Sequence, residues 1–163
     1  MDCIRWVENV SRDAVRRGDH TDMGPNAMLI QISDPAGAFP VPACDFKEVH
    51  QFEFLDAEDS CTIEDEAKIQ PEQAQEIMQL LQHAKDKHMN VLVHCQAGIC
   101  RSGAVVEFAA QIGFTPTERF RLPNLRVKRM LWETMGWGYT QEQAAADLTH
   151  NQKTASIGLI GFE

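Results

Sequence analysis

The stretch VLVHCQAGICRSG, residues 91–103, constrains the fold more than any other part of the 163-residue chain. Val91 to Val93 form an apolar run typical of a buried strand, and the mostly apolar residues 102–113 predict a buried helix that ends at Gly113. The residues between them form a glycine-containing loop. Such a loop directs several backbone N–H groups toward one point, and the helix dipole adds positive potential there. The stretch therefore predicts an anion site on a strand–loop–helix unit.

The remainder of the chain alternates between predicted strands and predicted helices. Strands are expected over residues 3–10, 28–33, 50–56 and 90–94. Helices are expected from the Ser11 and Asp13 cap region to Arg17, from Pro71 to Asn90, over 102–113, within 122–136 and over 140–151. This order favours a three-layer α/β/α sandwich with a central, mainly parallel sheet of four or five strands. We expect one domain over residues 1–150 and a C-terminal tail over 151–163, loose or docked on the domain.

The composition argues against several classes of partner. The formal net charge is −9 and the pI is near 5.1, whereas nucleic acids and anionic membranes attract a positive surface. No run approaches the roughly 18 apolar residues that a membrane span needs. The five cysteines are odd in number and irregularly spaced, which favours free thiols in a reducing compartment. We therefore expect a soluble, monomeric protein of the cytoplasm, or of the host cytoplasm if the source is viral.

Two side chains give the loop a specific chemistry. Arg101 carries a planar guanidinium that can hold two phosphoryl oxygens at once. Cys95, at the start of the loop, would face the converging N–H groups, so its thiol is expected to ionise below the free pKa of about 8.5. A thiolate beside a bound phosphate is placed for in-line attack on phosphorus. The predicted reaction has two steps, transfer of the phosphoryl group to sulfur and hydrolysis by water.

The segment HCQAGICRSG, residues 94–103, resembles the signature loop of the cysteine-dependent protein tyrosine and dual-specificity phosphatases. The segments FEFLDAED and LPNLRVKRML are similar to those of compact dual-specificity members, and QISDPAG resembles small bacterial and phage relatives. The resemblance implies a parallel sheet flanked by helices, no metal or other cofactor, and a separate aspartic acid that protonates the leaving oxygen. It also implies phosphorylated proteins or peptides as substrates.

The resemblance assigns roles to individual residues. Cys95 is the nucleophile, Arg101 the phosphate clamp, and Ser102 the hydroxyl that assists departure of the thiolate. His94 shapes the loop, and Asn124 matches a position whose side chain braces it. The phosphate-binding amides are those of Gln96, Ala97, Gly98, Ile99 and Cys100.

The general acid must be an aspartate on a loop that ends a strand and can reach the leaving oxygen. Asp56, just beyond Phe52 and Phe54, is our first candidate. Asp59 is the alternative, because the DAED segment can be aligned in either register. The other acidic residues between Asp45 and Glu66 are interpreted as a solvated loop.

The sequence leaves two interpretations open both for Cys100 and for the basic residues between Arg119 and Arg129. Cys100 is either an inert buried thiol or a redox partner of Cys95, as in low-molecular-weight tyrosine phosphatases, whose loop also ends in ICRS. The five basic residues between Arg119 and Arg129 form either a solvated surface or a patch that steers phosphorylated substrates. A zinc site involving His83, His88 or His94 is not expected, because the chain has no C-x-x-C pair.

The predicted function is hydrolysis of phosphotyrosine in proteins, with phosphoserine and phosphothreonine as further substrates through a shallow pocket. One alternative is a phosphate-binding pseudophosphatase module that has lost catalysis. Another is the same chemistry on an RNA 5′-phosphate or a phosphoinositide. The neutral variable positions of the loop argue against a phosphoinositide, since such enzymes often carry lysines there.

Overall fold

A computed structural model describes residues 5–161 of the chain, with the side chains of residues 5–157. Its five strands are β1 (Trp6–Ser11), β2 (Ala27–Ser33), β3 (Glu48–Glu53), β4 (Asn90–Cys95) and β5 (Thr115–Pro116). They form one sheet in the order β3-β2-β4-β1-β5, and every neighbouring pair is parallel. The structure confirms the predicted α/β class. The two-residue strand β5 was not predicted, because it is too short to show a period-two pattern.

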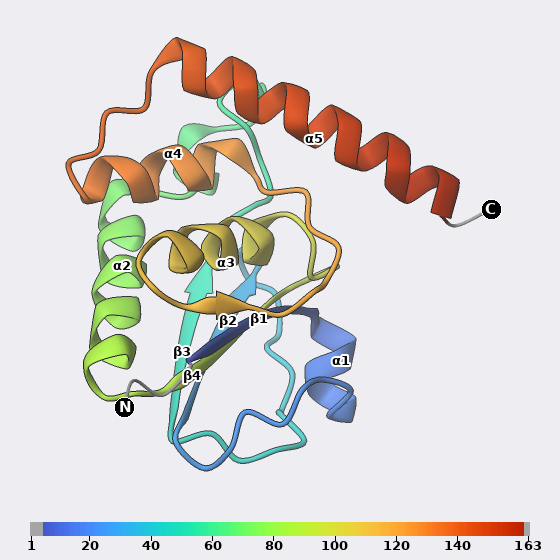
Figure 1. The fold of residues 1–163 in the computed structure, drawn as a ribbon, viewed down its shortest axis with the longest axis vertical. Helices are drawn as coiled ribbons and strands as arrows, with labels where there is room; N and C mark the ends of the chain where they lie inside the picture. The colour runs from blue at the N-terminus through green and yellow to red at the C-terminus, as the bar shows by residue number, and fades with distance from the viewer. Residues whose placement is uncertain (1–4, 162–163) are drawn as a thin grey trace.

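The helices are α1 (Arg12–Arg17), α2 (Pro71–Asp86), α3 (Arg101–Gln111), α4 (Leu125–Thr134) and α5 (Gln141–Gly161), with a short 3₁₀ helix, η1 (Asp65–Ala67). Helices α2, α3 and α4 pack together on one face of the sheet, while α1 covers part of the other (Figure 1). The three predicted layers are therefore present but unequal. No helix within residues 5–161 is long and apolar enough to cross a membrane.

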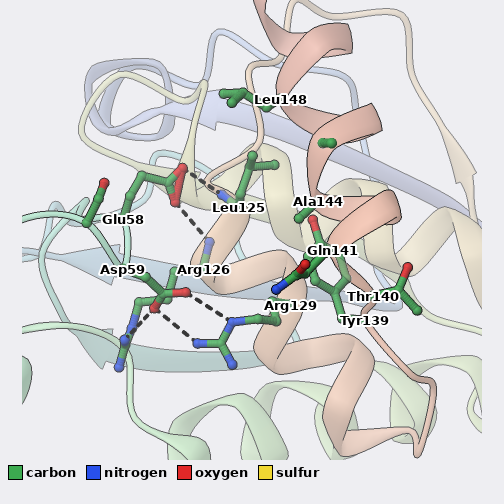
Figure 2. A pocket seen from close by; sticks show the side chains of 12 residues that line it. Glu58, Asp59, Leu125, Arg126, Arg129, Tyr139, Thr140, Gln141, Ala144 and Leu148 are labelled. Carbon is green, nitrogen blue, oxygen red and sulfur yellow. Dashed lines mark hydrogen bonds and ion pairs between the residues drawn. The ribbon is translucent and has the colours of Figure 1, made fainter.

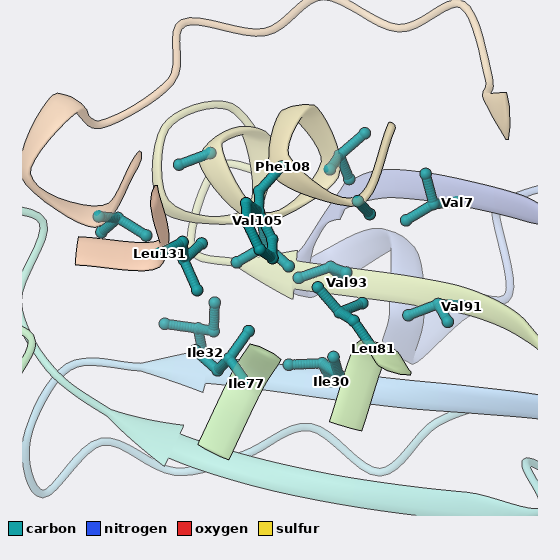
Figure 3. Close-up of a cluster of buried hydrophobic side chains, with 14 of the residues drawn as sticks. Val7, Ile30, Ile32, Ile77, Leu81, Val91, Val93, Val105, Phe108 and Leu131 are labelled. Atoms are coloured by element: carbon teal, nitrogen blue, oxygen red, sulfur yellow. The ribbon is translucent and has the colours of Figure 1, made fainter. Parts of the chain in front are cut away.

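The core lies on both faces of the central strands. On β2, the side chains of Met28, Ile30 and Ile32 join the larger cluster beneath α2, α3 and α4 (Figure 3). Ala27 and Leu29, which alternate with them, join the smaller cluster beneath α1. This two-sided burial explains why β2 is an almost continuous apolar run in the sequence, as is usual for parallel strands.

The predicted starts of two helices are confirmed. Helix α1 begins after Ser11, whose side chain accepts a hydrogen bond from the Ala14 N–H, and ends at Gly18 in the left-handed conformation. Helix α2 begins at Pro71, where the missing N–H has no intrahelical partner to lose. It ends at Asp86, earlier than predicted, because Asn90 already starts β4.

Two further predicted boundaries are wrong. Strand β3 ends at Glu53 instead of Asp56, and beyond it the Phe54 N–H still bonds the Ser33 carbonyl while Leu55 turns to the Ala67 carbonyl. Helix α5 does not end at Asn151 but continues to Gly161, through residues that were expected to form the tail. No proline interrupts this segment, so its backbone hydrogen bonds can continue. The predicted strand residue Cys3 lies outside the described residues.

Candidate active site

The signature loop, residues 95–101, begins at the last residue of β4 and ends at the first residue of α3. Strand β4 lies between β2 and β1, so the loop stands where the carboxyl ends of three parallel strands meet. Gly98 has a φ of +75°, and a Cβ there would lie 2.2 Å from the Val10 carbonyl carbon. Only glycine fits this close approach to β1.

The carbonyl groups of the loop are held by segments outside it. The Gln96 carbonyl accepts from the Arg12 N–H (3.3 Å), that of Ile99 from the Leu122 N–H (3.1 Å), and that of Cys100 from the Asn124 and Ala104 N–H groups (both 3.0 Å). The N–H groups of residues 96–100 donate no hydrogen bond to any other part of the chain that the structure describes. Because a planar trans peptide points its C=O and N–H in opposite directions, fixing the carbonyls outside turns N–H groups inward.

Asn9 supplies the remaining support and was missed by the sequence analysis. This β1 residue is only 1% exposed. Its Nδ2 donates to the carbonyl oxygens of Gly98 (2.8 Å) and Phe120 (3.1 Å), and its Oδ1 accepts from Arg121 Nη1 (3.3 Å). One buried amide thus links β1, the signature loop and the segment before α4. An asparagine in an apolar strand gave no signal of this role, because its partners are backbone groups distant in sequence.

The Cys95 sulfur lies beside the Ser102 hydroxyl. Cys95 is 2% exposed, and its Sγ lies 3.2 Å from the Ser102 hydroxyl oxygen, which is fully buried. Ser102 belongs to the first turn of α3, so helix formation places its hydroxyl beside the sulfur. A hydroxyl at hydrogen-bond distance can donate to a thiolate and stabilise its charge.

Arg101 is held by two contacts on one nitrogen. Its Nη1 donates to Asp34 Oδ1 (2.8 Å) and to the Phe54 carbonyl oxygen (2.7 Å). The side chain is 4% exposed, and its buried Nε has no partner among the described residues. A buried, unpaired guanidinium N–H is costly unless a ligand accepts it.

Asp34 is a second residue that the sequence analysis missed. It follows directly after β2, the neighbour of β4. The carboxyl ends of parallel strands meet at one edge of the sheet, so a polar residue just after β2 was a candidate for the site. The sequence analysis used the segment QISDPAG only for its resemblance to bacterial and phage relatives and assigned Asp34 no role.

The structure places Asp56 next to the signature loop. The Asn124 Nδ2 donates to Asp56 Oδ1 (2.7 Å) and to the Ala57 carbonyl oxygen (3.2 Å), while the Asn124 main-chain N–H donates to the Cys100 carbonyl. Asn124 also caps α4 through the Val127 N–H. Asn124 therefore connects two loops: its side chain bonds the loop of Asp56, and its main chain bonds the signature loop. The bracing role of its side chain stays a prediction, and the contact leaves Asp56 Oδ2 uncommitted.

Asp59, the alternative acid, is engaged by α4 instead. Its carboxylate lies 2.7 Å from Arg126 Nη1 and 3.0 Å from Arg129 Nη2 (Figure 2). These two guanidinium groups hold the pKa of Asp59 below its ordinary value, although partial burial opposes them. A carboxyl group held in its charged form is a poor proton donor. The geometry thus favours Asp56 over Asp59.

The basic residues between Arg119 and Arg129 are ion-paired within the protein. The pairs are Arg119 with Glu8, Arg121 with Glu107, Arg126 with Asp59, Lys128 with Asp147, and Arg129 with Asp59 and Glu133. The ion pairs show that these charges are compensated within the protein, and a role in steering substrates stays a prediction. Their sequence separation from most of these acidic partners hid the pairing.

His94 is buried and neutral. It is 1% exposed, and its Nδ1 lies 3.4 Å from the Cys95 carbonyl oxygen. Burial lowers its pKa to about 4, and the neighbouring Arg12 and Arg101 charges act in the same direction. An uncharged imidazole packed against the loop agrees with a shaping role.

Cys100 is half-buried at the start of α3. Burial, followed by the nearby Asp56 carboxylate, raises the pKa of its thiol to about 12. The group is therefore protonated near neutral pH, which slows attack by its sulfur. A redox partnership with Cys95 stays a prediction.

The sheet and the loop agree with the arrangement that the resemblance to cysteine-dependent phosphatases implies. Neither a protein-family model nor a curated protein matches the chain. One similar solved structure is human DUSP28, with 13% sequence identity, a TM-score of 0.46, and coverage of 93% of this chain and 94% of that chain. A second is the human tyrosine phosphatase-like serine/threonine/tyrosine-interacting protein, with 16% identity, a TM-score of 0.40, and coverage of 82% of this chain and 78% of that chain. A third is OH1 from the Orf virus, with 18% identity, a TM-score of 0.44, and coverage of 77% of this chain and 79% of that chain. OH1 is described as a tyrosine phosphatase with triple substrate specificity. With TM-scores below 0.5, these matches leave the functional argument to the site itself.

Proposed function

We propose that the protein is a phosphomonoester hydrolase that acts on phosphotyrosine, and on phosphoserine and phosphothreonine, in proteins. The observation that carries this proposal is the buried Arg101 Nε, which lacks a partner among the described residues and belongs to the same loop as Cys95. A phosphoryl group would accept from Nε and from the inward N–H groups of residues 96–100. The Cys95 sulfur in the same loop supplies a nucleophile for such a group.

The first step transfers the phosphoryl group to sulfur. The Cys95 thiolate attacks phosphorus in line, an S–P bond forms, and the bond from phosphorus to the leaving oxygen breaks. Asp56, protonated on Oδ2, donates its proton to that oxygen. Asp34 and the Phe54 carbonyl fix the opposite side of the Arg101 guanidinium, so its remaining N–H groups are held toward the phosphoryl oxygens.

The second step hydrolyses the cysteinyl-phosphate. The Asp56 carboxylate takes a proton from water, the water oxygen attacks phosphorus, and the S–P bond breaks. The electron pair of that bond returns to Cys95 as a thiolate. The Ser102 hydroxyl, 3.2 Å from the sulfur, donates a hydrogen bond that stabilises the leaving thiolate.

The test is hydrolysis of p-nitrophenyl phosphate with EDTA present, by the native chain and by Cys95→Ser. Cys61→Ser is the matched control, because Cys61 is an exposed free cysteine. We expect native turnover, loss of turnover in Cys95→Ser and native activity in Cys61→Ser. Tungstate binding without turnover by the native chain would instead indicate the phosphate-binding module. Comparison of phosphotyrosine and phosphothreonine peptides then tests the dual specificity.

A further inference from the structure

A groove lies beside the signature loop, between the Asp56 loop and α5. Asp56, Glu58 and Cys100 line one side, and Asn151, Gln152 and Ala155 of α5 line the other. Its volume is about 350 Å³. We call it the α5 groove. Cys100 belongs both to this groove and to the signature loop, so the groove adjoins the loop.

The α5 wall is fixed in place by polar contacts. Asp147, on α5, accepts hydrogen bonds from Lys128 Nζ (2.9 Å), the Tyr139 hydroxyl (2.5 Å) and Gln143 Nε2 (2.9 Å). One turn further along, the Asn151 Nδ2 donates to the Pro123 carbonyl oxygen (2.9 Å). The helix lies across the carboxyl-terminal end of the sheet and extends beyond α4 (Figure 1). The contacts hold a preformed wall there.

The position of the groove suits the chain that flanks a phosphorylated residue. A polypeptide advances about 3.3 Å per residue when extended. A segment whose phosphorylated side chain enters the signature loop must therefore lay its next one or two residues on adjoining surface. Asp56, the proposed acid, and Cys100, a residue of the signature loop, both line the groove, so it lies beside the candidate active site.

The polar groups of the groove select the charge of its occupant. They are carboxylates and side-chain amides, and no lysine or arginine is among the described lining residues. Both Glu58 oxygens accept hydrogen bonds from α4 main-chain N–H groups, those of Leu125 (3.1 Å) and Arg126 (2.9 Å). A second phosphate, such as that of a neighbouring nucleotide, would be repelled here.

We propose that the α5 groove binds the peptide next to the phosphorylated residue and favours a lysine or arginine there. This inference rests on the proposed function and names its substrate class, a phosphoprotein with a basic flanking side chain. Amides such as Asn151 and Gln152 would bond the peptide backbone, while the Glu58 carboxylate attracts the basic side chain.

The test compares kcat/KM for two phosphotyrosine peptides that carry either lysine or glutamate on both sides of the phosphotyrosine. The enzymes are the native chain, Gln152→Lys and Gln79→Lys, the last a matched control because Gln79 is exposed on α2. Gln79→Lys changes the net charge of the chain equally but far from the groove lining. Ala155→Trp, which fills the groove, is a second variant. Each is also assayed on p-nitrophenyl phosphate, which is too small to occupy the groove.

We expect the native chain to prefer the lysine peptide about three- to fivefold, the range of a partly exposed ion pair. Gln152→Lys should remove this preference, Gln79→Lys should keep it, and Ala155→Trp should raise KM for both peptides. Hydrolysis of p-nitrophenyl phosphate should stay within about twofold in all variants. No native preference, or one that survives Gln152→Lys, overturns the inference. If the native chain does not hydrolyse p-nitrophenyl phosphate, the proposed function is refuted instead.

Discussion

The contact of Asn9 with the signature loop predicts that a one-atom change far from the sulfur weakens phosphate binding. In Asn9→Asp the carboxylate can still accept from Arg121, but an oxygen replaces the amide that donates to Gly98 and Phe120. Leaving a buried carbonyl unpaired costs about 1–3 kcal/mol. If the cost of the unpaired Gly98 carbonyl destabilises the signature loop, the Kd for an oxyanion rises between about fivefold and about a hundredfold.

The assay is calorimetric titration with tungstate, an unreactive oxyanion, together with urea unfolding. Asn26→Asp is the matched control, because Asn26 Nδ2 also donates to two carbonyls, those of Lys87 (2.9 Å) and His88 (3.2 Å), near the amino end of β4. Both variants should lose stability, and only Asn9→Asp should lose tungstate affinity. If tungstate binds Asn9→Asp as tightly as the native chain, Asn9 has a structural role alone and our reasoning is refuted.

Three further predictions follow from the same site. Asp56→Asn should lower kcat on phenyl phosphate by about a hundredfold, whereas Asp59→Asn should leave it within about threefold; the reverse order would make Asp59 the acid. Asp34→Asn keeps a side-chain oxygen near Arg101 but removes the negative charge of residue 34. Charged and neutral hydrogen bonds differ by roughly 1 kcal/mol, so the Kd for tungstate should rise about fivefold. Unchanged tungstate affinity would show that Asp34 does not position Arg101 for the anion. The pKa of His94 falls from 6.5 to about 4 on folding. Between pH 6.5 and pH 4 the unfolded chain therefore binds a proton at His94 that the folded chain does not. The free energy of unfolding should fall by about 3 kcal/mol as the pH drops from 6.5 to 4. Urea unfolding of His94→Gln should show a shallower loss over that window, and equal slopes would contradict the assignment.

The sequence was sufficient for those parts of the molecule that depend on local pattern. Residues 91–103 predicted the strand, the loop and the buried helix, since glycine, apolar and helix-start signals fall within a few residues of one another. Ser11, Gly18 and Pro71 marked helix ends for the same reason. The general acid needed more than pattern, because Asp56 and Asp59 differ in their distant partners: Asn124 bonds Asp56, whereas Arg126 of α4 is paired with Asp59.

The missed residues depend on contacts between distant segments. Asn9 reaches the Gly98 carbonyl 89 positions away, and Asp34 reaches Arg101 across 67. Neither contact leaves a periodic signal in the chain. Asp34 could have been suspected from its place after the strand next to β4, whereas Asn9 could not. The extension of α5 to Gly161 was also missed, because the segment gives no amphipathic pattern.

The central claim is that Cys95 carries the phosphoryl group between two chemical steps. The most direct measurement is rapid acid quenching of the native chain with a ³²P-labelled phosphotyrosine peptide, followed by mass spectrometry of the labelled fragment. Our account predicts one phosphoryl group per chain, bound to Cys95 through sulfur, and none in Cys95→Ser. Turnover without an S-phosphate, or label that persists in Cys95→Ser, would contradict it.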